Sequence, residues 1–302
     1  MKAIVTGASG FVGKAVCDEL TESGYEVTAI VRDENLEKSR NINAANIVSC
    51  QMSEYRRLSE VIEERRFDVL YHFAWSGTSG SERGNYDIQL RNIRASCELA
   101  EQCAVLKCKR FVYAASIMEC EIAALMESDK NLAISSVYST AKLAADNMVR
   151  AVTAANNIEY IRAVISNIYG AGESSPRLIN TSIRKLLKGE HCSFSAGEQM
   201  YDFIYITDAA KIFVELGKKG KPNKTYYIGS RSPQPLKYFF SEMRDVVAPD
   251  AEIGLGDIPF DGISLDYSKF DTDAVYNDTG LEANVTFAEG IKLTADWIKV
   301  GN

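Results

Sequence analysis

The run Gly7-Ala8-Ser9-Gly10-Phe11-Val12-Gly13 constrains the fold of this chain more than any other segment. An apolar segment typical of a strand precedes it, and a segment with helical periodicity follows it. The first two glycines allow a tight turn and let backbone N–H groups approach a pyrophosphate, while the third lets the helix pack against the sheet. The helix start adds unpaired N–H groups and the positive end of its dipole. A glycine turn without a ligand has the same spacing, but this context favours a dinucleotide site formed by Gly7, Ser9, Gly10, Phe11, Val12 and Gly13.

Short apolar runs alternate with helical patterns through the first half of the chain. The predicted strands are Lys2–Thr6, Glu26–Val31, Ile47–Cys50, Val69–Phe73, Arg110–Ala114 and Glu159–Ile165. The predicted helices are Gly13–Glu22, Leu58–Glu64, Tyr86–Ala104 and Tyr138–Ala155. This alternation predicts an α/β fold with a Rossmann-type, doubly wound parallel sheet, in which ligands bind at the carboxyl ends of the strands.

The pattern loosens after about Gly170, and all six prolines lie beyond that point. Helices are expected at Arg177–Lys188, Ala209–Leu216 and Leu236–Val247. We expect residues 1–169 to form the NAD(P)-binding domain. Residues 170–302 would mainly form a smaller C-terminal substrate-binding lobe, with some segments returning to the Rossmann core.

Composition excludes several classes of function. The net charge of −7 gives no electrostatic help to non-specific binding of nucleic acid or a membrane surface, and the apolar runs are too short to span a bilayer. A strand predicted to begin at Lys2 leaves no room for a secretion signal, and the seven cysteines are odd in number without a Cys-x-x-Cys pair. We therefore expect reduced thiols and a cytoplasmic location. The two histidines lack metal-type spacing, so neither a metal site nor a serine–histidine triad is expected.

A Tyr-x-x-x-Lys pattern, Tyr138 to Lys142, opens a predicted helix and occurs at none of the other fourteen tyrosines. Residues four apart share one helical face. An ammonium group beside a phenol lowers the tyrosine pKa from about 10 toward neutrality, which suits general acid–base catalysis. The alternative is an ordinary helix-face tyrosine with a solvated lysine.

Ser116 strengthens the catalytic interpretation because it ends the strand that begins at Arg110, at the edge where ligands bind. A hydroxyl there can donate a hydrogen bond to a substrate carbonyl as negative charge builds on its oxygen. Taken alone, a serine in this place is more often a turn residue.

The residues after the second strand bear on the choice of dinucleotide. NAD-binding proteins usually carry an acidic residue there, whereas an arginine suits the 2′-phosphate of NADP. Arg32 comes first and Asp33 second, so NADP (NADPH) is favoured and NAD remains possible. Both side chains would be simple solvated charges in the alternative interpretation.

Together these motifs resemble the extended short-chain dehydrogenase/reductase family, in its NAD-dependent epimerase/dehydratase branch that modifies nucleotide-sugars. The resemblance covers nearly the whole chain. Further matching segments are His72-Phe73-Ala74-Trp75, Asn92, Asn167-Ile168-Tyr169-Gly170, Tyr201–Ala210, Asp278-Thr279-Gly280-Leu281 and Phe287–Ile291.

The resemblance implies roles for single residues. Tyr138 would exchange a proton with the sugar oxygen, Lys142 would tune Tyr138 and hold the nicotinamide ribose, and Ser116 would polarise the carbonyl. Asn167 would contact the substrate diphosphate, and Trp75 would line the nicotinamide pocket or belong to the core. The other implied cofactor contacts are Met52, Phe73, Ala74, Asn92 and Ile165.

The chain also departs from the family pattern. Tyr201 stands where the family often has an arginine for the diphosphate, so Arg177, Arg184 or Arg231 would have to replace it. Gln51-Met52 replaces an Asp-Leu pair near the adenine. Ser116 is followed by Ile117-Met118-Glu119 rather than Asp-Glu, which argues against a sugar 4,6-dehydratase.

The leading hypothesis is an NAD(P)-dependent oxidoreductase that reduces a 4-keto nucleotide-sugar. The alternatives are a nucleotide-sugar 4-epimerase with retained NAD, a reductase of a small carbonyl compound, and a non-catalytic dinucleotide-binding sensor. The resemblance further implies a homodimer in which the long helices starting near Tyr86 and Tyr138 pack across a twofold axis. A buried face on these helices fits Ile88, Ile93, Leu99 and Val149, although a monomer would bury some of them on its own sheet.

Overall fold

The structure is a computed structural model and describes residues 1–32, 41–128, 131–260 and 262–301. Internal contacts divide the chain into two compact units. The first unit comprises Met1–Val164, Ala210–Tyr226 and Asn277–Thr279. The second unit comprises Ile165–Ala209, Tyr227–Tyr276 and Gly280–Asn302.

In the described residues, seven strands form one sheet in the order β11-β6-β5-β4-β1-β2-β3. Their bounds are β1 Lys2–Thr6, β2 Glu26–Val31, β3 Asn46–Ser49, β4 Val69–His72, β5 Arg110–Ser116, β6 Glu159–Ile165 and β11 Thr225–Ile228. The pairs β1–β2, β2–β3, β1–β4 and β4–β5 are parallel. The strand order reverses between β1 and β4, which is the switch point where such sheets bind ligands. The predicted Rossmann-type sheet is therefore confirmed.

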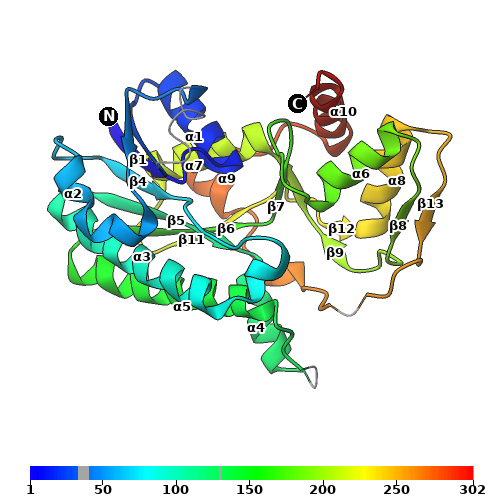
Figure 1. Ribbon diagram of the computed structural model, residues 1–302, viewed down its shortest axis with the longest axis horizontal. Coiled ribbons are helices and arrows are strands. Elements are labelled where there is room, and N and C mark those ends of the chain that lie inside the picture. Colours follow the sequence, from blue (N-terminus) through cyan, green and yellow to red (C-terminus); the bar gives the residue numbers. More distant parts are fainter. Residues whose placement is uncertain (33–40, 129–130, 261, 302) are drawn as a thin grey trace. The chain divides into compact units, whose positions relative to one another are not determined.

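Helices cover both faces of this sheet (Figure 1). The helices α1 (Phe11–Glu22) and α7 (Ile206–Lys219) lie on one face, and α3 (Tyr86–Val105) and α5 (Ser136–Ala155) lie on the other. Ala3, Ile4 and Val5 of β1 are fully buried because they point alternately into the two layers. This burial explains why the strands read as continuous apolar runs.

Several elements differ from the sequence prediction. The helix expected at 58–64 is only α2 (Leu58–Val61), and a 3-10 turn, η3 (Met52–Arg57), precedes it. The helix α4 (Met118–Met126) was not predicted, because its apolar pattern continues that of β5 without a glycine or proline break. The strand β11, also not predicted, follows α7 and joins the sheet as its seventh strand.

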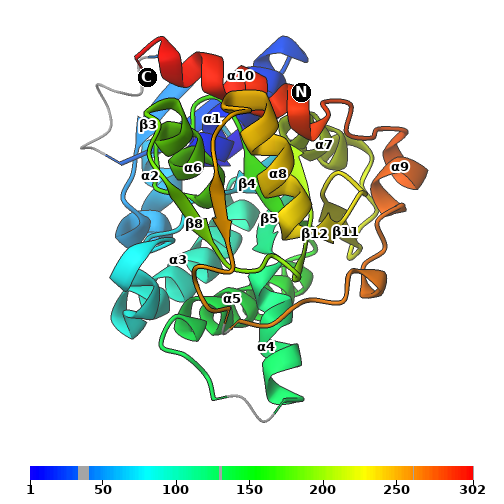
Figure 2. The same ribbon diagram turned by 90° about the vertical axis from the view of Figure 1, so that its right-hand side faces the viewer.

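The second unit contains three small strand pairs and a group of helices. The strands pair as β7 (Asn167–Tyr169) with β10 (Phe203–Tyr205), β9 (Met200–Tyr201) with β12 (Gln234–Pro235), and β8 (Cys192–Phe194) with β13 (Ile253–Leu255). The helices α6 (Leu178–Leu187), α8 (Leu236–Val247) and α10 (Phe287–Lys299) pack against one another (Figure 2). Remaining elements are η4 (Gly80–Gly84), η5 (Tyr267–Lys269) and α9 (Ala274–Thr279).

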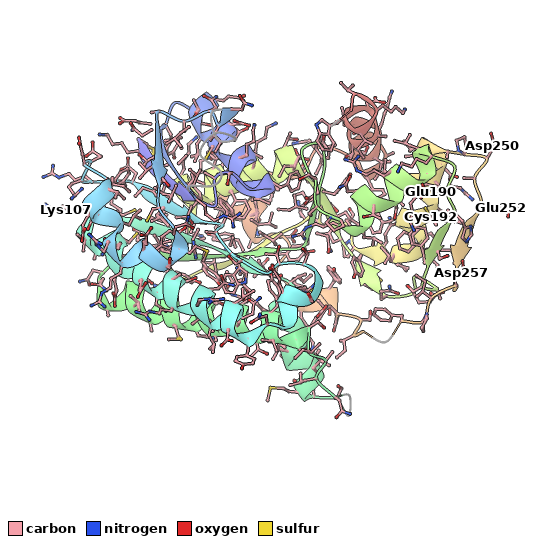
Figure 3. The ribbon with its side chains drawn as sticks, in the orientation of Figure 1. Lys107, Glu190, Cys192, Asp250, Glu252 and Asp257 are labelled. Atoms are coloured by element: carbon pink, nitrogen blue, oxygen red, sulfur yellow. The ribbon has the colours of Figure 1, made fainter. Side chains whose placement is uncertain are left out.

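The β8–β13 pair forms one edge of the second unit. Figure 3 labels Cys192 on β8 and Asp257 just beyond β13, and the two segments lie side by side because Cys192 pairs with Ile253. His191 Nε2 lies 3.0 Å from Asp257 Oδ2 and adds a polar link between the two segments.

The helices in the described part of the chain are too short or too polar to span a membrane.

Candidate active site

The glycine turn requires glycine for steric reasons. Gly7 has a φ of +70°, and a Cβ there would lie 2.7 Å from the backbone nitrogen of Ala74. A Cβ on Gly13 would lie 2.2 Å from the carbonyl oxygen of Gly7. Gly10 caps α1, and within the described residues no side-chain cap accepts from the first N–H groups of that helix. The turn therefore keeps backbone donors available for an anion.

The end of β4 is tied to its neighbours by His72, which is fully buried. Its Nδ1 lies 2.8 Å from Thr6 Oγ1 on β1, and its Nε2 lies 2.9 Å from Ser96 Oγ on α3. Burial lowers the pKa of His72 to about 3, so the ring is neutral. Its role is to fix the sheet edge on which the site stands.

Two buried amides of α3 hold the segment that follows β4. Trp75 Nε1 donates to Gln89 Oε1 at 2.9 Å. Asn92 accepts from Ser76 N at 3.1 Å and donates to Ser76 O at 2.8 Å. Gln89 and Asn92 are 1% and 2% exposed, so these hydrogen bonds form away from competing water. The indole is thereby fixed in place.

Lys142 lies in the first half of α5 and is buried against β5. Its ammonium group donates to Ala114 O at 2.7 Å. The same group lies 4.2 Å from the ring centroid of Trp75 and 4.6 Å from that of Tyr113. Burial lowers the pKa of Lys142 to about 8, although the carboxylates of Glu119 and Asp146 oppose this shift. The lysine is a poorly hydrated cation held at the carboxyl end of β5.

Tyr138 lies one turn before Lys142 and contacts the same indole. The Tyr138 and Trp75 rings meet edge to face with centroids 6.2 Å apart. Trp75 therefore touches both members of the Tyr-x-x-x-Lys pattern.

Ser116 ends β5, two residues beyond Ala114. Its hydroxyl oxygen accepts from Met118 N at 3.2 Å, and its backbone N–H donates to Glu119 Oε1 at 2.8 Å. The accepted bond fixes the hydroxyl at the start of α4. The hydroxyl hydrogen is then left to donate to another group.

A buried ionic network lies behind Ser116 and Lys142. Glu119, which is 2% exposed, accepts from Arg162 at 2.6 Å. Arg162 also donates to Asp146, which in turn accepts from the Tyr160 hydroxyl. Burial raises the pKa of Glu119, and the charges of Lys142 and Arg162 oppose that rise.

The remaining predicted cofactor residues of the first unit follow strands of the same sheet or lie in η3. Arg32 is exposed where β2 ends, and Asp33 lies outside the described residues. Met52 begins η3, with its sulfur 4.0 Å from Ser76 Oγ. Phe73 packs on Phe213 with ring centroids 4.8 Å apart.

The other predicted contacts belong to the second unit. Ile165 ends β6 and is half-buried. The Asn167 side chain donates to Asp202 O at 3.0 Å, so part of its hydrogen-bonding capacity serves the fold. Arg177 is exposed and lies 3.4 Å from the Glu173 carboxylate.

Sequence reasoning missed three residues of this site: Glu119 as a partner of Ser116, Gln89 as the partner of Trp75, and Arg83, whose guanidinium carbon lies 4.7 Å from the Tyr138 ring centroid. The spacing Ser-x-x-Glu from Ser116 is typical of a helix start and could have pointed to Glu119. No sequence signal marks the other two.

The model of the NAD dependent epimerase/dehydratase family matches residues 3–229 of this chain. The chain belongs to that family. It is therefore an enzyme of the short-chain dehydrogenase/reductase type that the Tyr-x-x-x-Lys pattern indicated.

Relatives in this epimerase/dehydratase family modify nucleotide-sugars. A trifunctional UDP-glucose 4,6-dehydratase/UDP-4-keto-6-deoxy-D-glucose 3,5-epimerase/UDP-4-keto-L-rhamnose-reductase of Arabidopsis thaliana is 23% identical over 97% of this chain. The chain spans only 46% of that relative's length and 58% of the length of a dTDP-D-glucose 4,6-dehydratase of Dictyostelium discoideum.

Solved structures of the epimerase/dehydratase family share the fold. The UDP-N-acetylglucosamine 4-epimerase of Methanobrevibacter ruminantium M1 is 20% identical, with a TM-score of 0.81 over 100% of this chain and 99% of that one. The UDP-glucuronic acid 4-epimerase of Bacillus cereus in complex with NAD is 18% identical, with a TM-score of 0.76 over 99% of each chain.

Proposed function

We propose that this protein is an NAD(P)-dependent oxidoreductase that reduces a 4-keto nucleotide-sugar. The observation that carries the proposal is the shared contact of Trp75 with Tyr138 and the Lys142 ammonium, at the sheet edge that also bears the glycine turn. A phenol, an ammonium group and the Ser116 hydroxyl on this edge form the set of groups that carbonyl reduction needs. The family supplies the nucleotide-sugar as substrate class.

The first unit fits a dinucleotide. The glycine turn, whose backbone packs closely on Ala74 and on the start of α1, and the uncapped N-terminus of α1 suit a pyrophosphate. Contacts with Gly10, Ala74, Asn92, Lys142 and the other residues predicted from the sequence remain part of this proposal. When bound, the dinucleotide supplies the hydride that the carbonyl carbon receives.

The side chains would divide the remaining work. Ser116 donates a hydrogen bond to the carbonyl oxygen and stabilises the charge that develops there. Tyr138 gives its phenolic proton to the same oxygen, so carbon gains a hydride and oxygen a proton. The Lys142 ammonium stabilises the phenolate that is left until solvent restores the proton. Asn167 and Arg177 would bind the substrate diphosphate.

The proposed reaction does not include the elimination of water that a sugar 4,6-dehydratase carries out. Glu119 is the carboxyl group nearest to Ser116 in sequence, and its two oxygens accept from Ser116 N and from Arg162. A carboxylate held by two donors at 2% exposure is a poor proton shuttle to a substrate.

The test is hydride transfer by purified protein with 4-keto nucleotide-sugars and NADPH or NADH. We expect reduction by the parent enzyme and a loss of 10²- to 10⁴-fold in Tyr138→Phe, because that variant keeps the ring but lacks the proton. Dinucleotide affinity should change little. If the parent oxidises neither cofactor across a broad carbonyl panel, the non-catalytic sensor gains.

The second candidate is a nucleotide-sugar 4-epimerase, and the 4-epimerases among the solved structures favour it. It would use the same residues but return the hydride to the opposite face of the sugar. Tightly retained NAD after gel filtration, with interconversion of C4 epimers, would establish the epimerase and exclude the reductase. Activity on small ketones, without stabilisation by any nucleotide diphosphate, would instead support a small-carbonyl reductase.

For the cofactor we propose NADP, because exposed Arg32 ends β2 where a 2′-phosphate would lie. Arg32→Ala should weaken NADPH binding about tenfold and leave NADH binding within twofold. The Bacillus cereus relative contains NAD, which makes NAD the natural competitor in that titration. Equal changes for both cofactors would contradict the NADP assignment.

We also propose a cytoplasmic homodimer. None of the seven cysteines forms a disulfide in the described structure, as expected for a reducing compartment. Leu99 and Val149, assigned from sequence to the dimer face, are instead fully buried within the protomer, because α3 and α5 pack on each other and on the sheet. Exposed Leu90 and Met148 on the same helices are the better candidates, and light scattering of Leu90→Lys tests them.

A further inference from the structure

Arg83 stands beside the reacting phenol without taking part in the proposed chemistry. It belongs to η4, in the segment between β4 and α3. Its guanidinium carbon lies 4.7 Å from the ring centroid of Tyr138. A charged side chain therefore lies against the ring of the proposed proton donor.

Within the described part of the chain, the Arg83 guanidinium has no hydrogen-bond acceptor. Its Nε is buried without a hydrogen-bond partner, and Arg83 makes no hydrogen bond or ion pair with any residue that the structure describes. The other two cations of the site are satisfied, since Lys142 donates to Ala114 O and Arg162 donates to two carboxylates. A buried donor left unpaired lowers stability, and the loss is larger on a charged group. Such a group calls for an acceptor that arrives with a ligand.

Glu121 on α4 supplies the anionic charge that acts on Arg83, yet the two groups form no ion pair within the described residues. Burial raises the pKa of Glu121 to about 7, and Arg83 opposes this rise. Near neutral pH this carboxyl is only partly charged. The Glu121 carboxyl therefore neutralises only part of the positive charge of Arg83, and it would compete with an anionic ligand for the guanidinium.

We propose that Arg83 binds an anionic group of the substrate, a carboxylate carried by the sugar next to the carbon that exchanges hydride. This inference rests on the proposed function and names its substrate class. Hydrogen bonds from guanidinium nitrogens reach acceptors about 2.9 Å away. An anionic group bound to Arg83 would therefore lie close to the sugar oxygen that receives the Tyr138 proton in the proposed reaction. The planar guanidinium matches a carboxylate through two parallel hydrogen bonds. A substrate phosphate shares this chemistry and is the competing source of the charge.

Titration calorimetry with UDP-glucuronate and UDP-glucose on dinucleotide-loaded protein separates these sources. The parent should bind UDP-glucuronate at least tenfold more tightly than UDP-glucose. Arg83→Met keeps an apolar chain over the Tyr138 ring and removes the charge. It should weaken UDP-glucuronate binding ten- to a hundredfold and leave UDP-glucose within twofold, whereas Arg83→Lys should lose less.

Glu121→Gln is the matched control, because it removes the competing carboxyl from the same surroundings. It should strengthen UDP-glucuronate binding severalfold, the opposite sign to Arg83→Met. Equal losses for both nucleotide-sugars in Arg83→Met would assign the arginine to a phosphate and overturn the carboxylate inference. Unchanged binding of both nucleotide-sugars in Arg83→Met would overturn the inference and leave Arg83 only a packing role against the Tyr138 ring. A parent that binds neither compound would instead refute the proposed function, and melting temperatures of the variants identify misfolding.

Discussion

The ammonium group of Lys142 lies 4.2 Å from the centroid of the Trp75 ring. A cation over an indole face at this distance is attracted by the ring quadrupole, and burial strengthens the attraction because water cannot screen it. The indole N–H donates to Gln89, so the ring cannot turn away. Trp75 therefore contacts both the Lys142 ammonium and the Tyr138 ring in the protein without substrate.

The first prediction concerns this indole. Trp75→Phe keeps an aromatic face and loses the hydrogen bond to Gln89, while Trp75→Leu loses both. A buried cation–π contact contributes about 0.5–2 kcal/mol, so kcat/KM should fall two- to thirtyfold in Trp75→Leu and less in Trp75→Phe. Trp297→Phe, in the second unit, is the control and should stay near the parent. Equal kinetics in all three variants would refute a role for Trp75.

The second prediction follows from the buried charge of Lys142. Its pKa is lowered to about 8 in the folded protein, against an ordinary value of 10.5. Between these values the unfolded chain binds more protons, so the free energy of unfolding should rise with pH in this window. Below about pH 8 both states are charged and the burial cost is fully present.

Lys142→Met lacks this dependence and is the reference. Between pH 7 and 10 the parent should gain on the order of 3 kcal/mol relative to Lys142→Met in urea denaturation. A constant difference between the two proteins would mean that the lysine pKa is ordinary in the folded state.

The sequence predicted the parts of the site that depend on local pattern. The glycine turn, the β5 strand leading to Ser116 and the helix bearing Tyr138 all follow from periodicity and spacing within a few residues. Glu119 and Arg162 are 43 residues apart, and their ion pair depends on how β6 and α4 pack. Local pattern carries no information about such a contact, nor about the position of Arg83 beside the Tyr138 ring.

The third prediction tests the glycine turn. Gly7 and Gly24 both have positive φ, +70° and +80°, but a Cβ on Gly24 would meet nothing within 4 Å. Gly24→Ala should cost only the left-handed backbone strain of about 1–2 kcal/mol. Gly7→Ala adds a clash with Ala74 N and should lower stability further and abolish dinucleotide binding. Urea denaturation and NADPH or NADH fluorescence titration measure both effects, and equal losses in the two variants would contradict the steric argument.

The fourth prediction concerns the buried pair of Glu119 and Arg162. Removing one partner of a buried ion pair leaves an uncompensated charge and costs about 3–5 kcal/mol. Arg162→Met should pay this cost, because Glu119 and Asp146 then lose the guanidinium that pairs with both of them. Glu119→Gln should lose less, since its amide oxygen can still accept from Ser116 N and Arg162 keeps Asp146.

Glu60→Gln is the control, because Glu60 pairs with Arg57 on the surface at 55% and 73% side-chain exposure. An exposed pair of this kind contributes little, so Glu60→Gln should unfold at nearly the parental urea concentration. In Glu119→Gln we also expect kcat to fall more than KM rises, because loss of the ion pair with Arg162 loosens the start of α4 against the end of β5, which bears Ser116, while the substrate surface is unchanged. Chemical denaturation gives the first result and steady-state kinetics the second. A Glu119→Gln enzyme with parental kcat would show that the carboxylate serves the fold alone.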